Sequence, residues 1–299
     1  MTISQFIKLT RPRTLTAAFS PVCLGAAFSY YFYPLAQSYN LSFLYSLLIL
    51  LTVIGAQIAA NIWNEYFDYK SGLDANQTIG NSGAITREGL SPKLIKKLGY
   101  LFTLLPAITG FSLAYMTTPY LIPVGVFCIA ISFFYSAGPM PLSRTPLGDL
   151  ASGIAMGFAI TLITAFIWAG QLTLFMLIAA LPSLLLIAAI LMANNLRDIK
   201  NDTKHGRHTL AIVLGRARAL HLLRNVFIFC NLWLCTFVFM KVLPLSTLIA
   251  CISAIPATKA IKIMHHFTDV VKMDHAMGYI AKATTTYHLL FAIGLLLAK

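Results

Sequence analysis

Long apolar stretches, separated by short polar connections, occupy most of the chain. About 20 consecutive apolar residues cross a bilayer as an α-helix, and a window of that length finds nine candidates. They cover residues 15–36, 42–62, 98–117, 119–136, 147–168, 172–193, 219–240, 243–263 and 278–298. The pattern predicts an all-α membrane protein, with a single polytopic domain of nine transmembrane helices over residues 1–299.

The amino-acid composition favours a membrane protein over a soluble one. Of the 299 residues, 58% are hydrophobic and 10% are charged, whereas soluble domains average about 45–50% apolar and about 25% charged residues. The low polarity also excludes an intrinsically disordered chain. Five cysteines, all within apolar stretches, are too few for a disulfide-stapled secreted domain. The first apolar stretch lacks a small-residue cleavage site, so we expect a retained span rather than a signal peptide.

Charged residues are distributed unevenly across the predicted topology. Twenty of the 22 Lys and Arg residues fall on one side of the spans, all but Lys241 and Lys299. The positive-inside rule makes that side cytoplasmic, together with the amino terminus and the connections 63–97 and 194–218. All nine Asp and Glu residues map to the same side. We therefore expect the functional site to lie at the cytoplasmic face of the cell membrane. The scattered basic residues do not indicate nucleic-acid binding, and no oligomeric state is predicted.

The first of two polar segments combines Asn and Asp residues at helical spacing. Asn61, Asn64 and Asp68 share one helical face, because residues i, i+3 and i+7 stack. Asp74 follows six residues later and does not share that face in a straight helix. Gly72 can end the helix and allow Asp74 to bend back.

The second polar segment repeats the pattern near the end of the sixth predicted span. Asn194, Asp198 and Asp202 form an i, i+4, i+8 row. The sequence Asn-x-x-x-Asp therefore occurs in both segments, each time at the cytoplasmic end of a span. Helix capping is the alternative interpretation, but a cap needs one acceptor rather than a spaced row.

Oxygen-rich segments of this kind suit Mg²⁺, which takes one or two carboxylates and completes its shell with water and phosphate oxygens. Two facing clusters can therefore hold a diphosphate through bridging metal ions. The predicted catalytic residues are Asn64, Asp68, Asp74, Asn194, Asp198 and Asp202, with the four aspartates as metal ligands. The residues predicted to neutralise the remaining phosphate charge are Arg87, Arg197, Lys204 and Arg207.

Five segments of the sequence resemble motifs of the UbiA superfamily of intramembrane prenyltransferases. Residues 64–74 and 195–202 are similar to its paired aspartate motifs. The other similar segments are 9–15 (LTRPRTL), 135–142 (YSAGPMPL) and 206–215 (GRHTLAIVLG). Their order and number make the resemblance specific, and within the superfamily it is strongest to the 1,4-dihydroxy-2-naphthoate polyprenyltransferases.

The sequence departs from that branch at a few positions. Ala137 stands where the branch commonly has Gly, and Asp149 stands where it commonly has Glu. Residues after Asp74 lack the Pro-x-Arg-Pro found in 4-hydroxybenzoate enzymes, which argues against that branch. A different aromatic acceptor, such as 4-hydroxybenzoate or homogentisate, remains the main alternative.

The resemblance implies nine helices around a central cavity open to the cytoplasm and to lipid. It implies Mg²⁺-dependent transfer of a polyprenyl group from polyprenyl diphosphate to 1,4-dihydroxy-2-naphthoate. Loss of CO₂ then gives demethylmenaquinol, in menaquinone biosynthesis. The expected partners are therefore a polyprenyl diphosphate, an aromatic acid and the lipid bilayer.

Three residues near the connection between the fourth and fifth predicted spans are candidates for binding the aromatic acceptor. Arg144 is the only basic residue in that connection and could pair with the acceptor carboxylate, although contact with lipid headgroups explains it equally well. Tyr135 could lie beside the aromatic ring or anchor the helix at the membrane interface. Asp149 could face the ring or cap the following helix.

Two other classes of membrane protein are disfavoured. A transporter or channel places its ionisable residues within spans or near the bilayer midplane, whereas here they cluster at one rim. A CDP-alcohol phosphotransferase requires a denser Asp-Gly-x-x-Ala-Arg segment, which is absent from the sequence.

Overall fold

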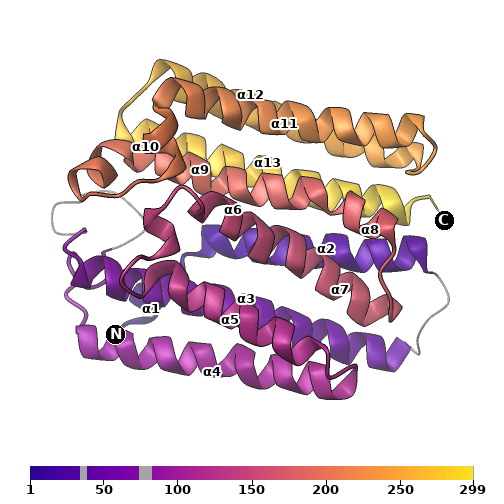
Figure 1. Ribbon diagram of the computed structural model, residues 1–299, viewed down its shortest axis with the longest axis horizontal. Helices are drawn as coiled ribbons and strands as arrows, with labels where there is room; N and C mark the ends of the chain where they lie inside the picture. Colours follow the sequence, from indigo (N-terminus) through magenta and orange to yellow (C-terminus); the bar gives the residue numbers. More distant parts are fainter. Residues whose placement is uncertain (34–38, 74–82, 299) are drawn as a thin grey trace.

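The computed structural model describes residues 1–33, 39–73 and 83–298. Long helices run side by side along the longest axis of the molecule (Figure 1). They are α2 (Pro12–Phe32), α3 (Tyr39–Lys70), α4 (Pro92–Met116), α5 (Leu121–Ser136), α7 (Ile160–Ala169), α9 (Leu181–Lys204), α11 (Arg216–Phe239), α12 (Ala254–His266) and α13 (Val270–Leu296). The shorter helices are α1 (Ile3–Thr10), α6 (Gly148–Ser152), α8 (Leu174–Ala179) and α10 (Leu210–Leu214).

Seven helical segments of the described chain are long and apolar enough to cross a membrane. They are Thr14–Phe32, Phe43–Lys70, Pro92–Met116, Gly148–Ala169, Leu174–Lys204, Arg216–Phe239 and Leu245–His266. The predicted span at 119–136 corresponds to α5, an apolar helix of only 16 residues. The predicted span at 278–298 overlaps α13, which is not among these seven segments and carries Lys282 inside the predicted span. The all-helical membrane fold is confirmed, whereas the count of nine spans is not.

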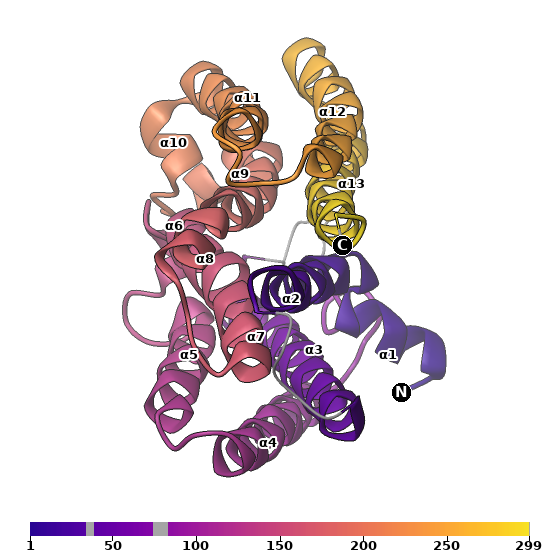
Figure 2. The same ribbon diagram turned by 90° about the vertical axis from the view of Figure 1, so that its right-hand side faces the viewer.

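Helix α2 occupies the centre of the bundle. It packs against α13 on one side and against α3 and α7 on the other, as the end-on view in Figure 2 shows. The pairs α3–α4 and α12–α13 are also in extensive contact. The bundle therefore has two halves, one containing α3, α4 and α5 and the other containing α11, α12 and α13. They are joined through α2 and through the contacts of α9 with residues 148–159.

Small residues allow the central helices to approach closely, as is common between membrane helices. A Cβ atom on Gly25 of α2 would clash with the Thr161 carbonyl oxygen, and one on Gly157 would clash with the Ser183 carbonyl oxygen. The Ser183 hydroxyl also donates to the Gly157 carbonyl over 3.1 Å. Gly157 lies in a π-helical stretch, Gly153–Ala159, between α6 and α7. This packing holds α7 against α2 and the π-helical stretch against α9.

Both acidic segments lie at the same end of the bundle. Helices α3 and α9 end there, close to α1 and α10, whereas the carboxyl terminus lies at the opposite end (Figure 1). A buried carboxylate also attaches the α3–α4 connection at this end. Glu65 is 1% exposed, and its Oε1 accepts hydrogen bonds from the amides of Gly83 and Ile85, each over 3.0 Å. Arg11 approaches the other carboxylate oxygen to 3.7 Å.

Candidate active site

Arg207 joins the two acidic segments. Its Nη2 donates to Asp68 Oδ1 over 2.9 Å, and its Nη1 lies 3.5 Å from Asp202 Oδ1. Asp68 is on α3 and Asp202 is on α9, so carboxylates from distant parts of the sequence meet at one guanidinium. The chain reaches this position because Gly206 adopts a positive φ of 67° after α9, a conformation that glycine tolerates without strain.

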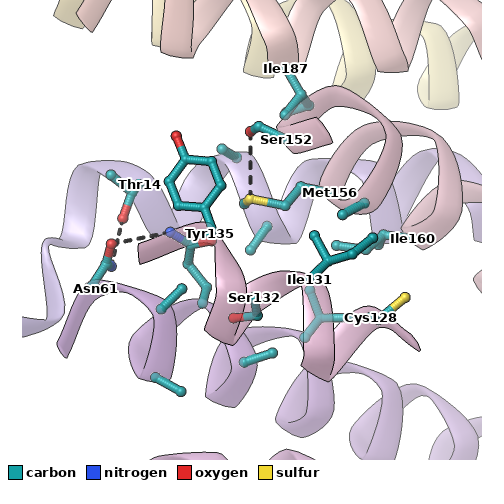
Figure 3. Close-up of a pocket in the computed structure, with 18 of the residues that line it drawn as sticks. Thr14, Asn61, Cys128, Ile131, Ser132, Tyr135, Ser152, Met156, Ile160 and Ile187 are labelled. Carbon is teal, nitrogen blue, oxygen red and sulfur yellow. Dashed lines mark hydrogen bonds between the residues drawn. The ribbon is translucent and has the colours of Figure 1, made fainter. Parts of the chain in front are cut away.

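A cavity of about 600 Å³ opens beside these carboxylates, a size typical of ligand pockets. The polar residues lining one part of it include Asn64, Asp68, Asn194, Asp198, Asp202 and Arg207. The apolar residues lining it include Ile49, Leu113, Leu121, Cys128, Ile160 and Ile167. Figure 3 shows Tyr135 projecting between Asn61 and Ser152, with Cys128, Ile131 and Ile160 further along. The cavity can therefore hold a molecule with a polar head and a long apolar tail.

Arg197 organises the second acidic segment. Its side chain is 2% exposed. It binds both carboxylate oxygens of Asp198, from Nε over 2.9 Å and from Nη2 over 2.6 Å. Nη2 also donates to Asn194 Oδ1 over 2.6 Å, and Nη1 donates to Asp274 Oδ1 over 2.6 Å. Sequence analysis missed Asp274, because it lies on α13 and nothing in its local spacing points to α9.

The asparagines of the first segment also have defined partners. Asn64 lines the cavity and accepts a hydrogen bond from the Ser136 hydroxyl at the end of α5. Asn61 donates to the Thr10 carbonyl and to the Thr14 hydroxyl, each over 2.9 Å. Asn61 therefore connects α3 to the start of α2, whereas Asn64 connects α3 to α5.

The three candidates for the acceptor site lie in different places. Tyr135 lines the cavity. Arg144 lines a neighbouring hollow of about 370 Å³, together with Phe67 and Lys70. Asp149 is 3% exposed and accepts a hydrogen bond from Asn195 Nδ2 over 2.7 Å, so it packs against α9 rather than lining the cavity.

Two other predicted residues do not line this cavity. Lys204 is exposed at the end of α9, and Arg87 is exposed on the α3–α4 connection. Their contact with phosphate stays a prediction. Asp74 falls outside the described residues, so its predicted role as a metal ligand also stays a prediction.

The polar part of the cavity lining, with Asp68, Asp198 and Asp202, is called its mouth below. Its oxygen donors fit Mg²⁺ better than a transition metal. Among the described residues, no group of three or more His, Cys, Asp and Glu side chains is close enough to hold a metal ion. Mg²⁺ does not need such a cage, because it uses one or two carboxylates together with water and phosphate oxygens. Asp202 also keeps a buried Oδ2 that has no hydrogen-bond partner, and this oxygen is available to a cation.

Comparison with known proteins agrees with this geometry. The profile of the UbiA prenyltransferase family matches residues 16–277. The chain is 33% identical over 291 residues to the 1,4-dihydroxy-2-naphthoate octaprenyltransferase of Bacillus subtilis, covering 97% of this chain and 92% of that protein. It is 30% identical over 239 residues to the Haemophilus influenzae protein of the same name, covering 77% and 76%.

Solved structures share the fold. A UbiA homolog from Archaeoglobus fulgidus bound to DMAPP and Mg²⁺ superposes with a TM-score of 0.67 at 15% identity, covering 97% of this chain and 99% of that one. The apo structure of a UbiA homolog from Aeropyrum pernix gives a TM-score of 0.69 at 15% identity, covering 96% and 98%. With its motifs in order, its acidic residues at the mouth of an apolar cavity and these matches, the chain belongs to the UbiA prenyltransferase family.

Proposed function

We propose that the protein transfers a polyprenyl group from a polyprenyl diphosphate to 1,4-dihydroxy-2-naphthoate, with loss of CO₂, to give demethylmenaquinol. The observation that carries the proposal is the meeting of Asp68 and Asp202 at Arg207, beside an otherwise largely apolar cavity. Relatives from Bacillus subtilis, Haemophilus influenzae and Mycobacterium tuberculosis are named 1,4-dihydroxy-2-naphthoate octaprenyltransferases, which supports the choice of acceptor.

The cavity matches the two parts of the prenyl donor. Burying the apolar tail is favourable by about 0.8 kcal/mol per CH₂ group. The diphosphate head needs cationic partners at the mouth. A UbiA homolog from Archaeoglobus fulgidus has been solved with GPP and Mg²⁺, which supports a prenyl diphosphate in the equivalent cavity.

Asp68, Asp198 and Asp202 are the described residues that would hold Mg²⁺, with Asp74 as the fourth predicted ligand. When bound, the metal would neutralise negative charge that develops on the departing diphosphate. Arg207 is suited to help, because its Nε is buried without a hydrogen-bond partner while its other nitrogens face Asp68 and Asp202. Its guanidinium can therefore gain phosphate contacts without leaving the mouth.

Transfer needs no nucleophile from the protein. The electron-rich naphthoate ring attacks C1 of the prenyl group, and the C1–O electron pair leaves with the diphosphate. The ring then loses its carboxyl group as CO₂ and becomes aromatic again. The cavity wall excludes water from the developing allylic cation, and Tyr135 lies where it can orient the ring.

Arg144 supports a binding position for the acceptor carboxylate. It shares its hollow with Phe67, Lys70 and Ser136. Ser136 is the donor to Asn64, so the hollow and the cavity meet at this hydrogen bond. An aromatic acid with its carboxylate on Arg144 can therefore point its ring towards the mouth of the cavity. We place this mouth on the cytoplasmic side of the cell membrane, because the predicted topology gathers the basic residues there.

The experiment supplies membranes that contain the protein with labelled polyprenyl diphosphate, Mg²⁺ and a panel of phenolic acids. We expect a prenylated product with 1,4-dihydroxy-2-naphthoate. Product with 4-hydroxybenzoate and none with the naphthoate would contradict the proposed acceptor while keeping the reaction class. Movement of the labelled polyprenyl diphosphate across the membrane without formation of any product would contradict an enzymatic function and favour a transporter.

A further inference from the structure

Two arginines each bridge a pair of carboxylates at the same end of the bundle. Arg207 contacts Asp68 and Asp202. Arg197 contacts Asp198 and Asp274. Each pair joins two different helices, α3 with α9 in one case and α9 with α13 in the other. A guanidinium between two carboxylates offsets their mutual repulsion.

The two arginines differ in their surroundings. The Arg207 side chain is 12% exposed, and its buried Nε has no hydrogen-bond partner. The Arg197 side chain is 2% exposed, and each of its three nitrogens has a partner within 3 Å: Asp198, Asp274 or Asn194. Arg197 cannot turn towards a substrate without giving up its ion pairs with two partly buried carboxylates, which is costly.

We infer that Asp274 of α13 is a positioning residue, which acts through Arg197 to fix Asp198 and Asn194 at the mouth of the cavity. The bidentate Arg197–Asp198 pair has a defined geometry, but it needs a second anchor to set its direction. Asp274 supplies that anchor over 2.6 Å. Side chains that hydrogen-bond to metal ligands commonly orient those ligands in this way. The inference rests on the proposed binding of a divalent metal ion by Asp198.

Helix α13 does not need Asp274 to stay in place. Its buried residues include Ala276, Ile280 and Ala283. The Thr284 hydroxyl donates to the Leu186 carbonyl of α9 over 3.1 Å, further along the same interface. Removing the Asp274 charge should therefore change the geometry of Asp198 without unfolding the helix pair.

The test compares Asp274→Asn with Asp269→Asn in purified full-length protein. Asp269 caps α13 by accepting a hydrogen bond from the Lys272 amide over 3.1 Å, and Asn caps a helix as well as Asp does. The control therefore removes one carboxylate from the same end of the same helix. The readout is Mn²⁺ affinity in the presence of inorganic diphosphate, measured by electron paramagnetic resonance titration alongside the melting temperature.

We expect Asp274→Asn to weaken Mn²⁺ binding about tenfold, the usual scale for groups behind a metal ligand. Asp269→Asn should bind Mn²⁺ like the native protein, and Asp274→Glu should recover part of the loss. If Asp274 acts through Arg197, adding Asp274→Asn to Arg197→Gln should weaken binding no further. In the three variants of Asp269 and Asp274 alone, the melting temperature should stay close to the native value.

Two results would overturn the inference alone. One is native-like Mn²⁺ affinity in Asp274→Asn, and the other is a full additional loss when Asp274→Asn is combined with Arg197→Gln. A native protein that binds no Mn²⁺ in the presence of diphosphate would instead overturn the proposed metal site, and this inference with it.

Discussion

Arg207, just beyond the end of α9, donates a hydrogen bond from Nη2 to Asp68 Oδ1 of α3 over 2.9 Å. This contact closes the gap between two segments that lie far apart in the sequence. It also places a largely buried cation, with a side chain 12% exposed, at the mouth of the cavity, where the proposed diphosphate has to bind.

Replacing Arg207 with Gln should raise the KM for polyprenyl diphosphate by tenfold or more, because a charge-assisted, partly buried phosphate contact is lost. The substitution also leaves Asp68 and Asp202 without their shared cation. Arg218→Gln is the matched control, since Arg218 is exposed on α11. An unchanged donor KM in Arg207→Gln would show that this arginine does not contact the diphosphate.

Replacing Glu65 with Gln should loosen the connection between α3 and α4. The carboxylate accepts hydrogen bonds from the amides of Gly83 and Ile85, and hydrogen bonds to charged groups contribute about 1.5–3 kcal/mol each. Hydrogen exchange at residues 83–90 should become faster in Glu65→Gln. Glu88→Gln is the control, because Glu88 pairs with the exposed Lys8. Equal exchange rates in the two variants would refute the anchoring role of Glu65.

Replacing Gly157 with Ala should destabilise the bundle. The added methyl group clashes with the backbone of Ser183 in α9, and overpacking of this kind costs about 1–3 kcal/mol. We expect the melting temperature in detergent to fall by several degrees. Gly125→Ala on α5 adds the same methyl group where no atom lies within 4 Å, so its melting temperature should not fall. A native-like melting temperature for Gly157→Ala would mean that the helices can separate without cost.

Replacing Arg144 with Gln should raise the KM for the aromatic acid and leave the KM for the prenyl donor unchanged. The side chain lines the hollow beside Asn64 and Ser136. The Arg144 backbone carbonyl accepts a hydrogen bond from the His208 amide over 2.8 Å, and the substitution keeps that contact. Steady-state kinetics with each substrate varied in turn measure both constants. If Arg144 serves only lipid headgroups, both constants will match those of the native enzyme.

The acidic rows could be predicted from the sequence because helical spacing is a local property. Asn64 and Asp68, like Asn194, Asp198 and Asp202, line one cavity because residues three and four apart share a helix face. Long-range pairings follow no such rule. The contact between Arg197 and Asp274 depends on how α9 and α13 pack, and the local sequence around Asp274 resembles that of an ordinary polar loop.

Some features of the fold could not be predicted from a hydropathy window either. The π-helical stretch at 153–159 contains Gly157, which packs closely against α9, and apolar periodicity does not encode such packing. Glu65 precedes Asp68 by three residues, yet its carboxylate faces the α3–α4 connection rather than the cavity. The neighbouring helix and loop determine what each acid does.

The central claim is that both acidic segments hold one metal-bound diphosphate. Binding of a non-reactive polyprenyl thiodiphosphate to the purified protein, measured calorimetrically with and without Mg²⁺, tests it most directly. Asp68→Asn and Asp202→Asn should each weaken Mg²⁺-dependent binding by tenfold or more, and the double variant should lose little beyond either single one. Native-like, Mg²⁺-dependent binding in either single variant would contradict the claim.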